Sequence, residues 1–445
     1  MAQAIYAVDK RENLRPFLLQ FGIVFLLILT LPLDRHYYQT LGSIQIGHIH
    51  FQDLFQLANY VPFLGHAGAW GWESFAGWSW ALALAFVAAA IWTRYDKTFI
   101  VHEDGWQYGL RVLLRYRLAA ALLSYGFILL FAVQAPSPAL SDLHTKYGYF
   151  LPWKIYYESL AVSSAGYGPT LGIFEIAGGV LLLFRRTALI GAGIAAFLLI
   201  NIVLANFAYQ LGDEVISVYL LLIAIVLIAY DGPRLYQLLF REKKTAAEKF
   251  NPVFRGRWAA LRLALKALFV LFFIAYATLL YRSYSVDKWP YPETPGLQGA
   301  AGFYDVRHFS LNGTDRPYSL VDSLRWEDVV FEKWNTISVN ENRTTPINEQ
   351  RPAIAFQGTG IERVYESLGN GQRSFYTYEV KGDHLTLINK NDGKTAYEFD
   401  IKRPGSGQIL LEGRDKAGNM LQIELSKVDK KYLLYLGRRH PVKVY

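Results

Sequence analysis

The sequence predicts a membrane bundle of about seven transmembrane α-helices, followed by an antiparallel all-β domain outside the membrane. Hydrophobic residues make up 52% of the 445-residue chain and charged residues only 18%, a balance that soluble proteins of this length rarely show. Long apolar runs fill residues 16–281, and few follow them. Beyond residue 302, apolar and polar residues alternate with the two-residue period of β-strands.

Seven apolar runs are close to the length of about 20 residues that a helix needs to cross the hydrocarbon core. Because irregular backbone cannot face lipid, each run is expected to be helical. The predicted spans are Pro16–Leu33, Phe75–Trp92, Tyr116–Gln134, Gly168–Phe184, Thr187–Tyr209, Glu214–Tyr230 and Trp258–Tyr281. The connections 36–74 and Tyr147–Tyr157 are rich in Trp and Tyr, so they are expected at the membrane–water interface on the outer side.

Lys and Arg fall on alternate connections between the spans, which sets the orientation by the positive-inside rule. The inner segments rich in basic residues are 10–15, 94–115, 185–186 and 234–257. The outer connections hold only Arg35, Lys146 and Lys154. This pattern predicts a multi-pass protein of the bacterial inner membrane with a cytoplasmic N-terminus and a periplasmic C-terminal domain. The inner loops also explain the net charge of +8, and without a nucleic-acid-binding motif no nucleic-acid partner is predicted.

The C-terminal region carries six short alternating segments that predict strands. They are Phe375–Val380, His384–Asn389, Tyr397–Ile401, Gln408–Glu412, Met420–Leu425 and Tyr432–Leu436. The run Asn391-Asp392-Gly393-Lys394 is typical of a hairpin turn. Short strands at regular intervals, separated by turns, predict an antiparallel meander or a small barrel.

These patterns divide the chain into five parts. The predicted parts are two N-terminal helices with an outer interfacial loop (1–110), a four-helix core (111–236), a cytoplasmic loop with the seventh helix (237–281), a linker (282–302) and the periplasmic β-rich domain (303–445).

Glu175 is the most prominent candidate for a functional side chain, because it lies inside the fourth predicted span. A carboxylate within a membrane is costly unless it is paired or hydrated, so it marks a candidate ligand or proton site. Gly172 and Gly179 share its helix face and allow another helix to approach closely. The polar groups that are candidates to join it in a pocket near the outer surface are Asn201, Asn206, Tyr209 and Glu214. The alternative is that Glu175 hydrogen-bonds to Asn201 or Asn206 and pins the helix pair.

Other polar residues give weaker signals. The chain has no cysteine, which excludes disulfides, thiolate metal sites and thiol catalysis. The first outer loop holds His36, His48, His50 and His66, but no carboxylate lies at helical spacing from them, so interfacial histidines are expected and no metal site is predicted. The basic residues that enter the third span are Arg111, Arg115 and Arg117, which are expected to anchor it at the interface or to contact an anionic headgroup or a quinone oxygen.

Residues 111–236 carry several motifs that resemble the bacterial DoxX family. The motifs are Arg115-Tyr116-Arg117, Ser124-Tyr125-Gly126-Phe127, Gln134-Ala-Pro136, Tyr147-Gly148, the run from Phe174-Glu175 to Arg186-Thr187, the run from Asn201 to Asn206-Phe207, and Tyr230-Asp231 to Arg234-Leu235. The additional spans and the outer β-rich region resemble a long DoxX-like subgroup. The resemblance implies a four-helix membrane core with Glu175 as its intramembrane carboxylate. Because some members resemble the membrane subunit of a thiosulfate:quinone oxidoreductase, it also implies a quinone-linked redox role.

The sequence departs from that subgroup at Ile128, at Tyr149–Pro152 and at Tyr209–Glu214, where expected charged or motif residues are replaced. This loss favours a scaffold put to another use. We therefore expect an integral component of a cell-envelope complex, more a binding protein than an enzyme, whose periplasmic β-domain binds protein partners. The alternative is a quinone- or lipid-binding subunit of a membrane redox system. Its ring-binding residues would be Glu175, Asn201, Asn206, Tyr125 and Arg115, while catalytic residues are not identified by the sequence.

Overall fold

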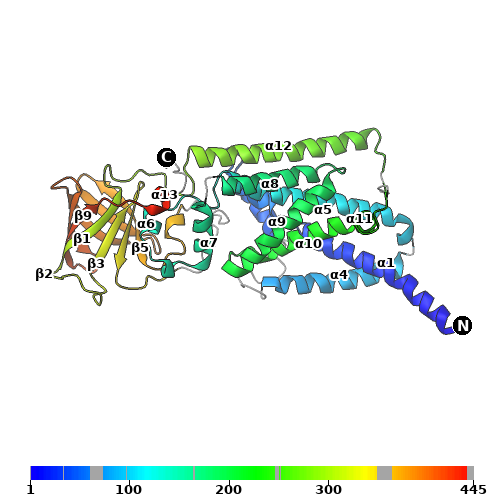
Figure 1. Ribbon diagram of the computed structural model, residues 1–445, viewed down its shortest axis with the longest axis horizontal. Helices are drawn as coiled ribbons and strands as arrows, with labels where there is room; N and C mark the ends of the chain where they lie inside the picture. The colour runs from blue at the N-terminus through cyan, green and yellow to red at the C-terminus, as the bar shows by residue number, and fades with distance from the viewer. Residues whose placement is uncertain are drawn as a thin grey trace. The chain divides into compact units, whose positions relative to one another are not determined.

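The computed structural model describes residues 2–33, 35–60, 74–96, 98–163, 166–245, 250, 252–347 and 363–437. The chain forms two compact units (Figure 1). The helical unit comprises Met1–Leu130 and Thr170–Tyr281, and the β-unit comprises Phe131–Pro169 and Arg282–Tyr445. The chain therefore passes from one unit to the other three times, and the predicted outer connection between the third and fourth spans belongs to the β-unit.

The helical unit contains most of the helices, and each predicted span corresponds to one of them. The helices are α1 (Ala2–Thr30), α2 (Arg35–Ser43), η1 (Ile46–His48), α3 (Phe51–Ala58), α4 (Ala76–Tyr95), α5 (Phe99–Leu130), α8 (Tyr167–Leu182), α9 (Ala188–Tyr209), α10 (Glu214–Ala229), α11 (Gly232–Leu239) and α12 (Arg257–Ser285).

Among the described residues, four helices are long and apolar enough to cross a membrane: α4, α5, α9 and α12. A fifth candidate is α10 together with α11, which follows it after a bend of 64°. The apolar part of α1, Leu14–Thr30, and α8 are shorter apolar helices. The helical half of the fold is thus observed with four to five candidate spans, whereas seven spans remain a prediction.

The core of the helical unit is apolar and tightly packed. It includes Leu26 of α1, Leu118 of α5, Ala195 of α9 and Ile223 of α10, all of which are buried. Helices α5 and α8 meet at two glycines, because a Cβ added at Gly172 would lie only 2.5 Å from the carbonyl oxygen of Gly126. The prediction that glycines on the Glu175 face admit a neighbouring helix is therefore confirmed.

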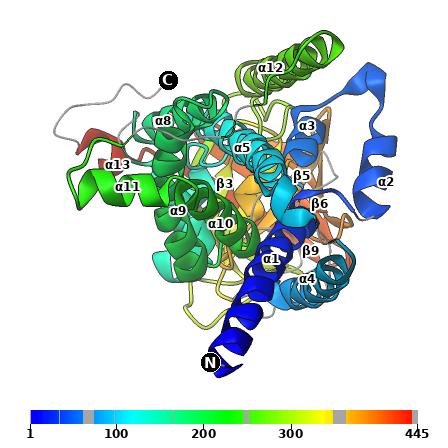
Figure 2. The same ribbon diagram turned by 90° about the vertical axis from the view of Figure 1, so that its right-hand side faces the viewer.

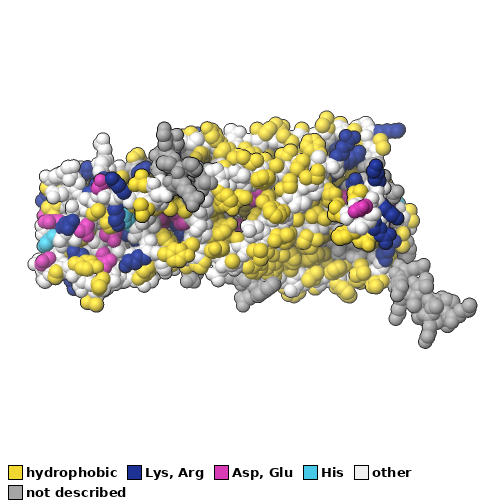
Figure 3. All heavy atoms as spheres, viewed as in Figure 1, with side chains coloured by type: hydrophobic (Ala, Val, Ile, Leu, Met, Phe, Trp, Pro, Cys, Tyr) yellow, Lys and Arg dark blue, Asp and Glu magenta, His cyan; other side chains and the backbone are white. Residues whose placement is uncertain are grey.

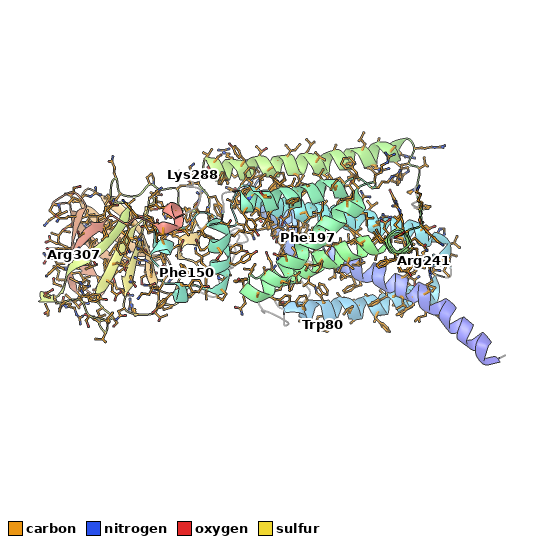
Figure 4. The ribbon with its side chains drawn as sticks, viewed as in Figure 1. Trp80, Phe150, Phe197, Arg241, Lys288 and Arg307 are labelled. Carbon is orange, nitrogen blue, oxygen red and sulfur yellow. The ribbon has the colours of Figure 1, made fainter. Side chains whose placement is uncertain are left out.

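The surface of the helical unit is apolar around its middle and basic at one end. Trp80 of α4 and Phe197 of α9 are 65% and 78% exposed (Figure 4). Hydrophobic side chains cover the middle of the unit, and Lys and Arg gather near α11 and the start of α12 (Figure 3). An apolar belt with a basic end is the surface expected of a bundle that spans a bilayer.

The β-unit is built on an antiparallel barrel. Its strands are β1 (Gly302–Leu311), β2 (Thr314–Asp315), β3 (Trp326–Phe331), β4 (Thr336–Glu341), β5 (Arg373–Lys381), β6 (His384–Asn389), β7 (Thr395–Lys402), β8 (Gln408–Asp415) and β9 (Met420–Val428). From β3 to β9 each strand pairs with the next, β1 pairs with both β3 and β9, and β2 forms only a short hairpin with β1. The sheet therefore closes on itself, with register running from Phe303↔Val428 to Leu311↔Leu421 at the closing seam.

The interior of the barrel is filled by side chains. Inward positions carry large apolar residues, among them Trp326, Phe331, Phe399 and Ile423, each at most 1% exposed. The closed sheet consists of β1 and β3–β9, and a barrel of about eight strands has an interior that side chains can just fill. Five predicted strands correspond to β5–β9, and the turn at 391–394 joins β6 to β7 with Gly393 at φ 67°.

One predicted strand is wrong. Leu433–Leu436 forms a short helix, α13, instead of continuing the sheet. Because β9 already pairs with β1, the barrel has no free edge there for another strand.

The outer face of β3, β4 and β5 is covered rather than solvated. All six residues of β4 are buried, including the outward-facing Thr336, Ser338 and Asn340. The cover comes from residues 131–169, which contain α6 (Leu140–Leu143), η3 (Tyr147–Tyr149) and α7 (Pro152–Ala161), and from η4 (Tyr365–Ser367).

Candidate functional site

Glu175 is buried in α8 at 3% exposure, and its Oε2 has no hydrogen-bond partner among the described residues. Its Cβ packs against α5, 3.1 Å from the position of a Cβ added at Gly126. Neither Asn201 nor Asn206 hydrogen-bonds to it in the described part of the chain. Asn201 is exposed, whereas the amide nitrogen of Asn206 donates to the carbonyl of Ile202 on its own helix.

The other predicted site residues separate into two groups. Arg115 is buried and donates from Nε and Nη2 to the carbonyl oxygen of Leu182, at 2.9 and 2.7 Å, where α8 ends. An arginine at that position satisfies a carbonyl that the helix leaves unpaired. Tyr125 donates to Asp213 at 3.3 Å, and the backbone N–H of Asp213 donates to Asn206.

The hydrogen bonds that join Tyr125, Asp213 and Asn206 stabilise the turn between α9 and α10. Glu214 is buried as the first residue of α10, and Tyr209 is 39% exposed at the end of α9. Among the described residues, no hydrogen bond or ion pair joins Glu175 to any of the other predicted residues. The polar pocket expected around Glu175 is thus not assembled from these groups.

The histidines of the first outer loop give no metal cluster in the described part of the chain. The backbone N–H of His50 donates to Asp53 at 2.8 Å, which is the start of α3. His66 and the side chain of His36 lie outside the described residues.

The strongest concentration of buried charge lies in the β-unit, where residues 131–169 pack on the barrel. Their backbone pairs with the chain just before β5: Leu151 N–H donates to Gly369 O, and Gly371 N–H donates to Tyr149 O, both at 2.9 Å. Phe150, labelled in Figure 4, lies between these two bonds. Gly369 has φ +68°, and a Cβ there would come within 2.7 Å of Trp153, so this approach requires glycine.

Lys154 of α7 is the centre of the cluster and is completely buried. Its Nζ donates to the carbonyl oxygen of Tyr365 at 3.0 Å and lies 3.9 Å from the centroid of the Tyr365 ring. Asp142 of α6 and Glu158 of α7 each place a carboxylate oxygen 3.5 Å from the same Nζ. One ammonium group thus faces two buried carboxylates that come from different helices.

A second ion pair lies on the barrel side of the cluster. Lys390 contacts Glu366 of η4 at 2.5 Å, and both side chains are at most 4% exposed. The same carboxylate oxygen accepts hydrogen bonds from Thr336 Oγ1 at 3.0 Å and from Trp334 Nε1 at 3.3 Å. The outward face of β4 is therefore joined to η4 by a charged hydrogen-bond network.

Glu332, at the end of β3, binds the start of α6. Its two carboxylate oxygens accept the backbone N–H groups of Ser141 at 2.8 Å and of Leu140 at 3.2 Å. A carboxylate at this position satisfies two donors that the first turn of a helix leaves unpaired.

Arg373 of β5 completes the contact and is also completely buried. It forms a 2.6 Å ion pair with Asp328 of β3 and donates to Ser338 Oγ of β4 at 2.8 Å. On the covering segment, His144 stacks on Phe303 at 3.9 Å between ring centroids. Burial, reinforced by nearby Lys430 and Arg373, lowers the pKa of His144 to about 4, so this ring is neutral at pH 7.

The carboxylates of the cluster hold protons more tightly than exposed ones. Burial, with repulsion from Asp142, raises the pKa of Glu158 to about 8, and burial raises the pKa of Asp142 as well. Burial also raises the pKa of Glu332 to about 7. Because buried carboxylates outnumber the lysines that face them, the cluster carries protons near neutral pH.

Sequence reasoning missed this cluster. Asp142, Lys154 and Glu158 lie in a stretch that is predicted to be an interfacial loop, and the hydrogen-bond partner that joins Lys154 to the rest of the β-unit, Tyr365, lies 211 residues further along the chain. The only local sign was the spacing of Lys154 and Glu158, which places both on one helix face. The geometry of the cluster is that of a structural tie, because both ammonium groups and the carboxylates of Asp142 and Glu366 are at most 4% exposed.

Comparisons with known proteins give little further information. No family model matches the chain, and no solved structure matches it. A curated relative, the uncharacterized protein YwoB of Bacillus subtilis (strain 168), is 36% identical over 73 residues. The match covers 16% of this chain and 47% of that protein, so the chain spans about half the length of the relative.

Replacing Lys154 tests whether the cluster holds residues 131–169 to the barrel. Lys154→Met leaves two buried carboxylates without a counter-charge, a change that costs about 3–5 kcal/mol. We expect chymotrypsin to cleave the full chain faster within residues 147–157. Adding Asp142→Asn and Glu158→Gln to Lys154→Met should restore resistance, since no uncompensated charge remains. Equal resistance of the wild type and Lys154→Met would contradict the assignment.

The pH dependence follows from the raised pKa values. Glu158 and Glu332 have an ordinary pKa near 4.5 when exposed, whereas the lowered pKa of His144 acts in the opposite direction below its ordinary value of 6.5. Between about pH 6.5 and 8 these two carboxyls therefore make the folded β-unit bind more protons than the unfolded chain. Stability must then fall as pH rises through this window. We expect the protease resistance of residues 131–169 to decrease from about pH 6.5 to about pH 8.

The matched variants separate this effect from general pH sensitivity. Glu158→Gln combined with Glu332→Gln should flatten the pH profile, because glutamine resembles the protonated acid. Glu424→Gln, at an exposed position of β9, should leave the profile unchanged. A wild-type profile that rises with pH would show that the sign is wrong.

Proposed function

We propose that the chain is an inner-membrane component of a bacterial cell-envelope complex, and that its periplasmic β-unit binds a protein partner. The proposal includes a DoxX-like scaffold for residues 111–236, whose helices α5, α8, α9 and α10 share one apolar core. The apolar belt and basic end of the helical unit support membrane insertion with the basic end in the cytoplasm.

The observation that carries the proposal is an exposed apolar loop between β2 and β3, residues 316–325, which we call the β2–β3 loop. Its apolar side chains stand in solvent: Tyr318 62% exposed, Leu320 71%, Val321 91% and Leu324 52%. Contiguous exposed apolar groups mark interaction sites. Because side chains fill the barrel, binding is expected on its outside.

The β2–β3 loop is held in one conformation by its own polar residues. Asp322 accepts the backbone N–H of Leu324 at 2.9 Å and forms a 3.0 Å ion pair with Arg316. The backbone N–H groups of Leu324 and Arg325 donate to Asp322 and lower its pKa, and the charge of Arg316 lowers it further. Asp322 is therefore ionised at neutral pH. The buried Arg325 donates to three backbone carbonyls, including Val306 O of β1 at 2.9 Å. A loop ordered before binding loses little conformational entropy in a complex.

The alternative proposal is a quinone- or lipid-binding subunit of a membrane redox system. Its support is the buried Oε2 of Glu175, which has no hydrogen-bond partner in the described part of the chain and can accept a proton or a hydrogen bond. Among the described residues, none of the others proposed for the ring hydrogen-bonds to that oxygen, so we rank this proposal second.

The test compares partner binding by matched variants of the full chain extracted in detergent. Leu320→Asp with Val321→Asp removes the centre of the β2–β3 loop, and Leu433→Asp with Leu436→Asp places the same charges on α13, at 81% and 62% exposure. A protein that co-purifies in fixed ratio with the wild type should bind the loop variant about 30-fold more weakly, since a central apolar contact contributes about 2 kcal/mol. The α13 variant should bind normally.

The outcomes also separate the two proposals. A wild-type chain that purifies alone, with a stoichiometric quinone that Glu175→Gln loses, would replace the first proposal by the second. Equal loss of the partner in both aspartate variants would show that the β2–β3 loop is not the docking surface.

A further inference from the structure

Three basic side chains meet where α5, α8 and α12 approach one another at the basic end of the helical unit. They are Arg115 of α5, Arg262 of α12 and Lys266 of α12, and we call them the cation cluster. The positive charges of Arg262 and Arg115 both repel that of Lys266, and Arg262 and Arg115 also repel each other. The three positive charges are therefore close enough to destabilise one another.

Among the described residues, no carboxylate pairs with the cation cluster. Arg115 donates to Leu182 O from Nε and Nη2, and no hydrogen bond from its Nη1 is seen to the described residues. The ammonium of Lys266 lies 4.3 Å from the ring centroid of Phe184, and the guanidinium of Arg262 lies 5.6 Å from that of Phe254. A nearby basic residue, Arg111, is by contrast paired with Asp231 at 3.2 Å.

The surface around the cation cluster is apolar and open. Helix α12 lies at the margin of the helical unit in Figures 1 and 2. Its side chains from 257 to 268 are exposed apart from that of Lys266, and they include Leu263 at 70% and Leu268 at 63%. From Phe269 onward α12 packs on α5, through Tyr116 and then through the hydrogen bond from Tyr276 to Ser124 O.

We propose that the cation cluster binds the phosphodiester headgroup of an anionic phospholipid, whose acyl chains cover the exposed leucines of α12. An anion among three like charges removes their mutual repulsion, and the neighbouring apolar surface selects a lipid over a free anion. Basic groups between transmembrane helices at the cytoplasmic side are a recognised form of headgroup site. This proposal rests on the membrane insertion included in the proposed function, but not on the protein partner.

The experiment measures which lipid stays bound to the full chain. Protein purified in detergent is incubated with equal amounts of phosphatidylglycerol and phosphatidylcholine, and bound lipids are counted by native mass spectrometry. The test variant is Arg262→Gln with Lys266→Gln, because neither side chain makes a hydrogen bond to a described residue. The control is Lys243→Gln with Lys244→Gln, which removes equal charge from the exposed chain after α11.

We expect the wild type and the control to retain phosphatidylglycerol selectively. The test variant should lose that preference by about 30-fold, or about fivefold for each cation removed. Equal retention of the two lipids by the wild type would overturn the proposal, and so would an equal loss in the control, because diffuse surface charge would then explain binding. Displacement of phosphatidylglycerol by inorganic phosphate would also overturn it in favour of a free-anion site.

The result is independent of partner binding by the β-unit. A failed headgroup test leaves the β2–β3 loop as a docking surface unchanged. A chain that stays soluble without detergent would instead remove the membrane part of the proposed function as well.

Discussion

The contact between residues 131–169 and the barrel depends on a buried ammonium group. Lys154 is sealed between Asp142 and Glu158 of its own segment and Tyr365 of the chain that precedes β5, and its contacts with Tyr365 form only when the segment and the barrel come together. The backbone pairing around Phe150 is short, so it cannot by itself fix the orientation of α6 and α7. Buried ion pairs are costly to desolvate, and their best-supported contribution is to exclude other arrangements. Here they select one docking of the segment on β3, β4 and β5.

This docking changes how the two units are connected. Without it, residues 131–169 would be a long loop of the helical unit and the barrel would follow α12 on a single connection. With it, the chain enters the β-unit from α5, leaves it toward α8, and enters it again after α12. The covered face of the barrel is unavailable to partners, and its filled interior is unavailable to ligands. The surface left for recognition includes the β2–β3 loop, while the cation cluster is a separate surface of the helical unit.

The sequence predicted the elements whose signals are local. Long apolar runs located the helices, and alternation located β5–β9. Strands β6–β9 have one face on the core and one largely exposed, whereas β5 kept its alternation although its first four residues are buried on both faces. The prediction failed where a strand has both faces buried or an irregular register. The outward residues of β4 are small and polar but covered, and β3 contains a register shift between Trp326 and Asp328 that breaks its alternation. The helix at Leu433–Leu436 was taken for a strand because closure of the barrel is not visible in a local pattern.

The candidate sites were harder to predict for the same reason. Glu175 was found, since a carboxylate in an apolar run stands out, but its expected partners were chosen by depth alone and proved to serve the ends of helices. The charges around Lys154 resemble surface residues, and only the fold brings them to Glu332, Glu366 and Tyr365. Amphipathic or apolar segments can be recognised from a local sequence pattern, whereas a buried ionic cluster depends on contacts between residues far apart in the chain.

Amide hydrogen exchange of the full chain in detergent measures this docking most directly. The account predicts that the amides of Leu151 and Gly371, which bond across the contact, exchange as slowly as those of the neighbouring strand β5. Fast exchange of residues 147–158 at the rate of an unstructured peptide, while β5 stays protected, would show that the segment is not docked and would contradict the account.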